Sequence, residues 1–133
     1  MELRIENETS VSDLQKQFNA YFPYLQLDFF TGDKSKGRVQ RTVRANPNQL
    51  VTQLLGDYDP IKLIVSSETT VADLLKRFKE IGLNAQISRR SGNLWIETRF
   101  TDDWTLERQN KEAILFSISN QQLLNEASRQ VRN

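Results

Sequence analysis

The sequence predicts an α+β fold in which two β-α-β-β-α units pack with pseudo-two-fold symmetry and a C-terminal helical tail follows. The first observation is an internal repeat. When the chain is compared with itself at an offset of 60 residues, positions 3–32 align with positions 63–92, and ten of these thirty positions are identical. About two identities are expected by chance. The second observation is that strand-like and helix-like apolar patterns follow one another in the same order in both copies.

The most similar part of the two copies is a strand that leads into a helix. A β-rich segment, at 3–6 and again at 61–66, precedes Ser10 or Thr70. We expect these two residues to cap the helices, because a hydroxyl accepts a hydrogen bond from the free N–H groups of the first turn. An aspartate follows three residues later, near the positive end of the helix dipole. The apolar residues at helical spacing are Val11, Leu14, Phe18 and Tyr21 in the first copy, and Val71, Leu74, Leu75, Phe78 and Ile81 in the second.

A second strand is expected after each of these helices. Pro23 and Gly82 mark the helix ends, and the segments 24–30 and 84–90 then alternate apolar and polar residues, as half-buried strands do. A strand–helix–strand step favours a right-handed crossover that places the helix on one face of a sheet. We therefore expect such a crossover in each copy.

Each second strand is predicted to turn back into a hairpin. In the second copy a tight turn around Gly92 leads to a return strand at 94–100, as expected of a short glycine-containing turn between two strand patterns. In the first copy a longer polar loop at 31–37 leads to a return strand at 38–44. The offset between the copies shrinks after this loop for that reason.

A helix is predicted after each hairpin, and another in the tail. In the first copy Pro47 suits the first position of a helix, and in the second copy an aspartate pair before Trp104 suits its cap. The tail has a helical pattern at 121–131, for which Ser119 or Asn120 is the expected cap. The apolar residues of that pattern are Leu123, Leu124, Ala127 and Val131. This stripe is expected to cover the second half of the chain or to form a homo-oligomer contact.

The domain organisation follows from these units. The first repeat occupies residues 1–60, the second occupies 61–116 and the tail occupies 117–133, with the boundary between the repeats at 57–60. A repeat of about 55 residues buries little core of its own. We therefore expect one compact unit in which the two repeats either share one core or join two sheets.

The composition excludes several classes of function. The chain has no cysteine and no histidine, which excludes disulfides, thiolate zinc sites, iron–sulfur clusters, thiol nucleophiles and triads that depend on histidine. The five glycines are isolated from one another, so no phosphate-binding loop is present. The carboxylate pairs lie where helix caps and turns use them. We expect no cofactor, no metal and no catalytic residue.

The charge and the first residues bear on partners and location. Eighteen Lys and Arg against seventeen Asp and Glu give a net charge of +1, which is far from the strong positive charge of a dedicated nucleic-acid-binding protein. The first residues show no signal-peptide pattern, and no apolar run is long enough to span a bilayer. We therefore expect a cytoplasmic protein without a membrane partner.

A local excess of positive charge gives one candidate partner surface. Positions 31–44 carry a net charge of +4, and arginines flank Trp95 in the second hairpin. Guanidinium groups beside an aromatic ring can stack on bases or bind an anionic peptide. A solvated hairpin whose charges protect a sheet edge from aggregation explains the same pattern. The residues of this basic-hairpin surface are Lys34, Lys36, Arg38, Arg41, Arg44, Arg89, Arg90, Trp95 and Arg99.

The second copy resembles a group of small, uncharacterised bacterial proteins. The similarity covers mainly residues 60–112 and includes a Thr-Val-Ala-Asp-Leu helix start. Its main signature is Ser-Gly-Asn-Leu-Trp-x-Glu-Thr, here at 91–98, followed by Thr-Asp-Asp-Trp-Thr-Leu at 101–106 and Gln-Asn at 109–110. The resemblance implies no activity, ligand or functional residue. The first copy departs from this signature, because a Lys/Arg-rich loop replaces its tight turn.

Three hypotheses for function follow. The leading one is a non-catalytic cytoplasmic interaction module whose partner is a protein, because the chain carries two hairpins and lacks the usual catalytic residue types. The alternative is a binder of anions or nucleic acid that uses the basic-hairpin surface, and its binding would weaken steeply with salt. An enzyme that works without His or Cys ranks third.

Overall fold

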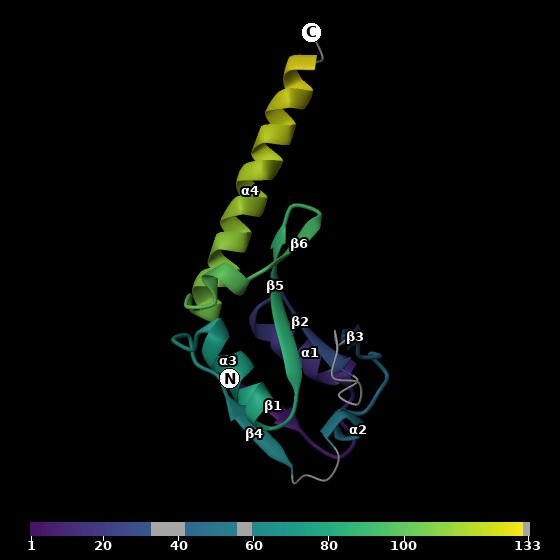
Figure 1. Cartoon of the computed structure of the whole chain (residues 1–133). Helices are drawn as coiled ribbons and strands as arrows, with labels where there is room; N and C mark the ends of the chain where they lie inside the picture. The colour runs from purple at the N-terminus through teal and green to yellow at the C-terminus, as the bar shows by residue number, and fades with distance from the viewer. Residues whose placement is uncertain (33–41, 56–59, 132–133) are drawn as a thin grey trace.

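The chain has a mixed α+β fold, as the sequence predicts, and its strands form two antiparallel sheets (Figure 1). The computed structural model describes residues 1–32, 42–55 and 60–131, with the backbone alone at residues 32, 42 and 119–131. The elements in chain order are β1 (Glu2–Ile5), α1 (Val11–Tyr21), β2 (Leu25–Gly32), β3 (Thr42–Arg44), α2 (Val51–Leu55), β4 (Ile61–Ile64), α3 (Val71–Glu80), β5 (Asn84–Ser91), β6 (Leu94–Glu97), a short 3-10 helix (Arg99–Thr101) and α4 (Leu106–Val131). Most of the predicted first hairpin loop, and of the boundary at 57–60, lies outside the described residues.

Each sheet joins the two halves of the chain. β1 pairs with β4 in a two-stranded sheet, and the order of the four-stranded sheet is β3-β2-β5-β6. In both pairs that cross the halves, residues 60 positions apart lie directly opposite each other. Leu3 lies opposite Leu63, and Leu27 lies opposite Ile87. The two halves therefore meet through backbone hydrogen bonds as well as through side chains.

The predicted crossover within one sheet is wrong. The strands on either side of α1 belong to different sheets, and so do the strands on either side of α3. The reason is that the two short strands β1 and β4 pair with each other, which lets Leu3 and Ile5 bury their side chains fully in the core. Both expected ways of joining the halves occur together, because the halves share one core and also form two sheets.

The hydrophobic core lies between the helices and the sheets and takes side chains from both halves. Phe29 of β2 and Phe78 of α3 meet edge to face, with their ring centres 5.3 Å apart. The largest fully buried side chains are Phe18, Phe29, Phe78, Leu3, Ile5, Leu14, Leu25, Leu27, Leu74, Leu83, Ile87 and Leu106. Tyr21, which the sequence places in the apolar stripe, is 57% exposed. It is the last residue of α1, where the chain already turns towards β2.

The helix caps are confirmed. The Ser10 hydroxyl accepts a hydrogen bond from the Asp13 N–H, and the Asp13 carboxylate accepts one from the Ser10 N–H, each at 3.0 Å. This backbone bond from Ser10 is the main reason that the pKa of the Asp13 carboxyl lies below its ordinary value of 3.8. In α3 the Thr70 hydroxyl accepts from the Asp73 N–H at 3.1 Å. Gly82 follows with a φ of 95°, which ends α3 in the left-handed conformation that glycine adopts readily.

The segments after the hairpins hold the starts of α1 and α3. Ser10 forms an isolated antiparallel bridge with Leu50, and Thr70 forms one with Thr105. The same backbone bonds surround both bridges, as in Val11 N–H to Gln49 and Ser12 N–H to Pro47 in the first half, and Val71 N–H to Trp104 and Ala72 N–H to Asp102 in the second. The free N–H groups at the start of each helix therefore donate to carbonyls in the segment that follows the hairpin of the same half.

These bridges explain why the next helices begin later than predicted. Pro47 lies in a turn and not at a first helical position, and α2 begins at Val51. The aspartate pair before Trp104 also lies in a turn, and α4 begins at Leu106, after Thr105, whose hydroxyl accepts from the helix. Both segments stay in a turn up to the bridge because their carbonyls bond the start of another helix.

Two further boundaries differ from the predictions. β6 ends at Glu97 because the chain turns into the 3-10 helix, so the return strand is shorter than 94–100. The tail is not a separate helix with its own cap at Ser119 or Asn120. α4 continues without a break to Val131, since no glycine or proline interrupts it.

Candidate functional site

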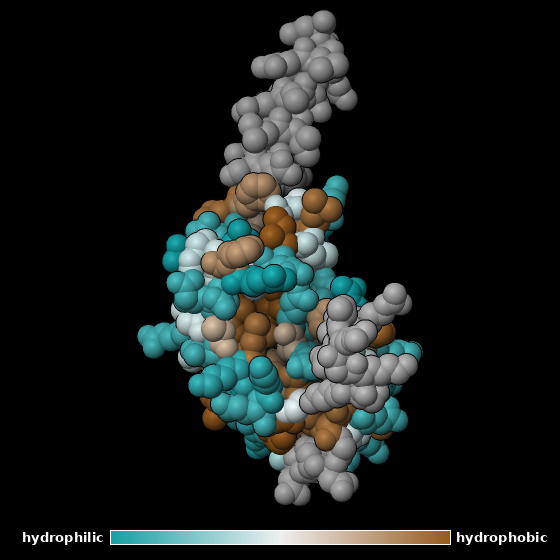
Figure 2. Space-filling view, in the orientation of Figure 1, coloured by the Kyte–Doolittle hydropathy of each residue, from teal (hydrophilic) through white to brown (hydrophobic). Residues whose placement is uncertain are grey.

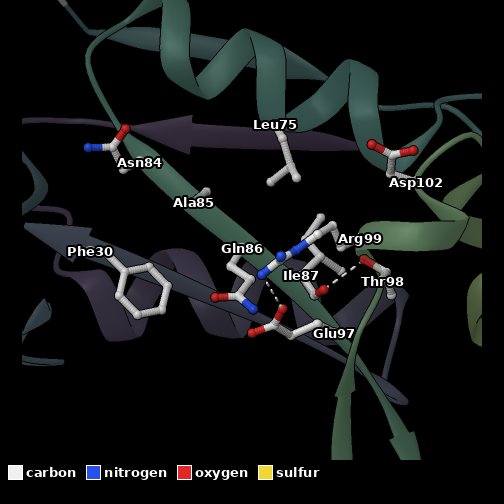
Figure 3. Close-up of a pocket in the computed structure, with 10 residues that line it drawn as sticks. All are labelled: Phe30, Leu75, Asn84, Ala85, Gln86, Ile87, Glu97, Thr98, Arg99 and Asp102. Carbon is white, nitrogen blue, oxygen red and sulfur yellow. Dashed lines mark hydrogen bonds and ion pairs between the residues drawn. The ribbon is translucent and has the colours of Figure 1, made fainter. Parts of the chain in front are cut away.

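A groove of about 420 Å³ opens between α3 and the edge of the four-stranded sheet (Figure 3). Its apolar side chains include Leu75 on α3 and Ala85 and Ile87 on β5, and Figure 3 shows Leu75 pointing from the helix towards the strand. The other lining residues are Phe30, Asn84, Gln86, Glu97, Thr98, Arg99 and Asp102. We call this feature the α3–β5 groove.

β5 has an unpaired edge along this groove. β2 pairs with β5 over residues 84–89, whereas β6 pairs with it only over residues 88–91. The chain leaves the edge after β6, where the N–H and the hydroxyl of Thr98 both donate to the Ile87 carbonyl, at 3.2 and 2.7 Å. Within the described residues, no strand lies beside residues 84–86 on this side. An open edge of this kind can pair with an added strand.

The backbone N–H and C=O groups of Ala85 point into the groove. In an antiparallel pair, successive residues direct these groups to opposite sides. The Arg90 N–H donates to the Tyr24 carbonyl on the β2 side, whereas the Ile87 carbonyl accepts from Thr98 on the other side. Ala85 lies two residues before Ile87 and therefore shares its direction. Among the described residues, we find no hydrogen-bond partner for either group of Ala85.

The groove continues along α3 into a smaller hollow. The hollow has a volume of about 260 Å³ and shares Leu75, Asn84 and Ala85 with the groove. It also contains Lys76 and Lys79 of α3, which makes this end of the site positively charged. The site is therefore longer than the groove alone and has a defined cationic end.

The other end of the groove carries charges of both signs. Arg99 and Glu97 form an ion pair there at 3.1 Å, which the close-up view shows (Figure 3). Both side chains are largely exposed, so this pair contributes little to stability. Asp102 lines the same end. This rim is polar and charged, while the floor beneath it is apolar.

Figure 2 shows the same arrangement on the molecular surface. An apolar strip lies at the position that β5 occupies in Figure 1, and hydrophilic side chains border it. Ile87 is 1% exposed and forms the deep part of the floor, whereas Leu75 and Ala85 are partly buried. The groove thus exposes apolar surface in a concave site, as ligand sites commonly do.

The structure separates the described members of the basic-hairpin surface. Arg90 lies opposite Trp95 in the β5–β6 ladder, so these two share one face of the sheet, and Trp95 is 45% exposed. Arg89 points to the other face, where its guanidinium lies 5.4 Å from the centre of the Trp104 ring. Arg108 lies closer to the same ring, at 3.9 Å. Arg89 and Trp95 therefore do not form one stacking platform.

The remaining members of that surface are also dispersed. Arg44 lies 3.8 Å from the nearly buried carboxylate of Asp28, and Arg99 lines the α3–β5 groove. The members that fall outside the described residues are Lys34, Lys36, Arg38 and Arg41. Of the five predicted residues that the structure describes, only Arg99 lines the groove.

The groove itself is not predicted from the sequence. Leu75 is predicted as part of the helix stripe that faces the core, and Ala85 as part of an alternating strand. Neither pattern reveals that β6 stops before it covers the whole of β5. The available signal is that the aligned copies differ in polarity here, since Leu75 aligns with Gln15 at the offset of 60.

Two other features are not found in the described part of the chain. No three Asp or Glu side chains there converge closely enough to hold a metal ion. None of the described helices has the length and apolar character to cross a bilayer. Comparisons of the chain with protein-family models, curated proteins and solved structures find no match.

Proposed function

We propose that the protein is a non-catalytic binding module that holds a segment of another protein in the α3–β5 groove. The observation that supports this function most strongly is the unpaired edge of β5 beside an apolar floor made by Leu75, Ala85 and Ile87. The floor favours an apolar side chain, and the free backbone groups favour a peptide. A volume of about 420 Å³ accommodates a few residues of such a segment.

The charges around the groove favour a protein partner over a nucleic acid. Glu97 and Asp102 place two carboxylates at one end of the groove, and the nearest cation, Arg99, is already paired with Glu97. A phosphate backbone that lay along the groove would meet these carboxylates and be repelled. A peptide can place a side chain of suitable charge at each end.

The proposal is tested by selecting ligands from a displayed library of short random peptides on the immobilised full-length protein. We expect the wild type to enrich peptides that no longer bind Leu75→Glu, because the new carboxylate occupies the apolar floor. The matched control is Ile64→Glu, which places the same charge at an apolar residue that is 67% exposed on β4. Circular dichroism verifies that both variants fold. Peptides that bind all three proteins equally would contradict the proposed site.

Anion or nucleic-acid binding is the second candidate function. The observation that favours it is that Arg90 and the exposed Trp95 share one face of the β5–β6 hairpin. The Arg90 guanidinium also donates to the Gly92 carbonyl at 3.1 Å, which uses part of its donor capacity. Binding to single-stranded nucleic acid that is lost in Trp95→Ala and weakens with salt would support this candidate.

We also propose that the chain arose by duplication of a β-α-β-β-α unit and retains a pseudo-two-fold axis. A strand that lies beside a two-fold axis pairs antiparallel with its own copy across the axis, so that the residue nearest the axis faces its equivalent. Leu3 opposite Leu63 and Leu27 opposite Ile87 fit this rule, because both pairs have the offset of the sequence repeat. The matching bridges at the starts of α1 and α3 support the same proposal.

Self-association through α4 is a further part of the proposal. Figure 1 shows α4 running past the β5–β6 hairpin and away from the rest of the fold. Leu115, Phe116 and Ile118 on this helix are each more than half exposed. Residues 113–125 contain no charged side chain, so a second copy meets no like-charge repulsion and a charged partner finds nothing to pair with. A helix that projects alone is marginally stable in water, which favours its pairing with a second α4.

A further inference from the structure

We infer that the partner segment binds as a short added strand that hydrogen-bonds to the backbone of Ala85. The peptide would lie beside β5 at the place that corresponds, in the first half of the chain, to the place beside β2 where two side chains of α1 bond the strand. This inference rests on the proposed binding function and adds to it the mode of recognition and the class of peptide. It follows from a comparison of the two halves at corresponding positions.

In the first half, α1 closes the corresponding edge of β2. Gln15 Nε2 donates to the Leu27 carbonyl at 2.8 Å, and Asn19 Nδ2 donates to the Leu25 carbonyl at 2.5 Å. The two amides are four residues apart on the helix, about 6 Å along its axis. The two carbonyls are two residues apart on the strand, about 6.7 Å. These spacings match, so two side chains on one helix face satisfy two successive outward-pointing carbonyls.

In the second half, both amides are replaced. Leu75 aligns with Gln15, and Lys79 aligns with Asn19, at the offset of 60. A leucine side chain cannot form a hydrogen bond, and the lysine side chain ends in a long, strongly hydrated ammonium group instead of a short amide. Both residues line the groove or its continuation. The helix face that closes the edge in the first half therefore leaves it open in the second.

The strand in the second half retains the need for a partner. Ile87 corresponds to Leu27, and its carbonyl accepts from Thr98. Ala85 corresponds to Leu25, and no described residue bonds its N–H or C=O group. Backbone polar groups that are partly buried are nearly always paired with protein or water. A peptide that is extended along the edge supplies both a donor and an acceptor at this point.

The groove also specifies the side chains of the peptide. In a ladder, residues that lie opposite each other point to the same face of the sheet. The peptide residue opposite Ala85 therefore points beneath Leu75 and should be apolar. Its two neighbours lie on the face of Asn84 and Gln86 and should be polar. Lys76 and Lys79 line one end of the site, so an acidic residue is expected there. The ligand class is an extended segment with a polar–apolar–polar pattern and an acidic residue at one end.

The test transfers the closing pair of the first half to the second. In the variant Leu75→Gln/Lys79→Asn, the new asparagine should bond the Ala85 carbonyl, as Asn19 bonds Leu25, and the new glutamine should remove the apolar floor, so that the peptide is excluded. The probe is a fluorescently labelled form of the peptide most enriched in the selection described above. Its affinity for the full-length protein should fall by about tenfold or more, which corresponds to the loss of one to two hydrogen bonds. The matched control, Ile64→Gln/Lys62→Asn on the exposed face of β4, should bind like the wild type.

Two further measurements test the role of the backbone directly. Ala85→Pro removes the N–H that points away from β2, so it should weaken the probe by a similar factor without breaking the β2–β5 ladder. In the wild type, the probe should slow hydrogen exchange of the Ala85 amide. A contrary result would be that enriched peptides bind Leu75→Gln/Lys79→Asn and Ala85→Pro as tightly as the wild type and leave the exchange of the Ala85 amide unchanged. In that case the added-strand inference is wrong, while the binding function stands. If the selection enriches no peptide, the binding function itself is wrong.

Discussion

At the scale of single residues, this protein uses short polar side chains to complete the hydrogen bonding of its backbone. The hydroxyls of Ser10 and Thr70 cap helices, and the hydroxyl of Thr98 bonds the last covered carbonyl of β5. Gln15 and Asn19 bond two carbonyls at a strand edge. Each of these bonds satisfies a backbone group that secondary structure leaves free. Where such a residue is missing, as at Ala85, the backbone remains available to a partner.

The capping box at Ser10 and Asp13 makes stability depend on pH. The pKa of the Asp13 carboxyl is lower in the folded chain than its ordinary value of 3.8. The ionised carboxylate therefore stabilises the fold fully above that pH, and this contribution is lost as the pH falls through the lower folded-state pKa. Asp13→Asn should accordingly be less stable than the wild type at neutral pH, and the difference should shrink in acid. Urea unfolding at about pH 7 and about pH 3 measures both.

The matched control for this prediction is Asp73→Asn. Asp73 has the same position in the first turn of α3, and its N–H is likewise bonded to the cap hydroxyl. Within the described residues, however, no bond joins the Thr70 N–H to the Asp73 carboxylate, whereas the corresponding bond is present at Ser10. Asp73→Asn should therefore cost less stability than Asp13→Asn at neutral pH. A stability difference for Asp13→Asn that is equal at both pH values would rule out the capping-box explanation.

At the scale of elements, α1 and α3 use the same buried face but differ beside the strand edge. Both begin after a hydroxyl cap and bury a Val-Leu-Phe set in the core, and these sets are Val11, Leu14 and Phe18, and Val71, Leu74 and Phe78. They differ at the position one residue after the buried leucine, where Gln15 closes an edge and Leu75 lines a groove. A helix can thus keep its packing while one of its flanks changes from closing an edge to opening a site.

This difference predicts that the first half can be opened in the same way. Gln15→Leu/Asn19→Lys gives α1 the residues of α3 and removes two hydrogen bonds to β2. The free energy of unfolding should fall by about 1–3 kcal/mol, because each such bond contributes roughly 0.5–1.5 kcal/mol. The edge of β2 should then bind the peptide probe as well. Isothermal titration should show the number of bound peptides rise from one per chain to two.

A variant that loses stability but still binds one peptide per chain would contradict this prediction. It would show that Gln15 and Asn19 stabilise β2 without controlling access to its edge. The control for non-specific effects on α1 is Lys16→Asn, since Lys16 is exposed on the same helix. This control should change neither the stability by more than a few tenths of a kcal/mol nor the number of bound peptides.

At the scale of the whole molecule, the two halves form one body and α4 extends from it. Both sheets contain strands from each half, and the core includes side chains from each half. The first part of α4 is anchored to this body through buried residues such as Leu106, Gln109 and Ala113. The exposed apolar residues further along the helix are the reason that we expect the full chain to self-associate.

Association through α4 is tested by one added charge. The wild type should sediment with twice the mass of the chain at about 100 μM and dissociate on dilution, as mass action requires. Ile118→Lys should be monomeric at the same concentration, because Ile118 is 53% exposed on α4 and a charge there opposes pairing. Ile64→Lys, at a residue that is 67% exposed on β4, should remain dimeric. A monomeric wild type, or an Ile118→Lys variant that stays dimeric, would exclude this contact.

The parts of the fold that depend on neighbouring residues were predictable from the sequence. The two caps, the first strand–helix–strand run of each half and the tight turn at Gly92 are present, and Gly92 has a φ of 62°. Starts of helices were less predictable where a distant segment competes for the backbone. Pro47 has the local preference for a helix start, but the bridge between Ser10 and Leu50 holds its segment in a turn, and the helix begins only at Val51.

The sequence by itself determined the α+β class and the identities of most core residues, because these follow from the period of apolar residues and from local capping and turns. Only the tertiary structure decided that β1 pairs with β4, that β6 stops short of covering β5, and that Ala85 faces a groove. Strand pairing joins residues far apart in the chain, and a pattern of alternation records which face of a strand is buried. It does not record which edge is left without a neighbour.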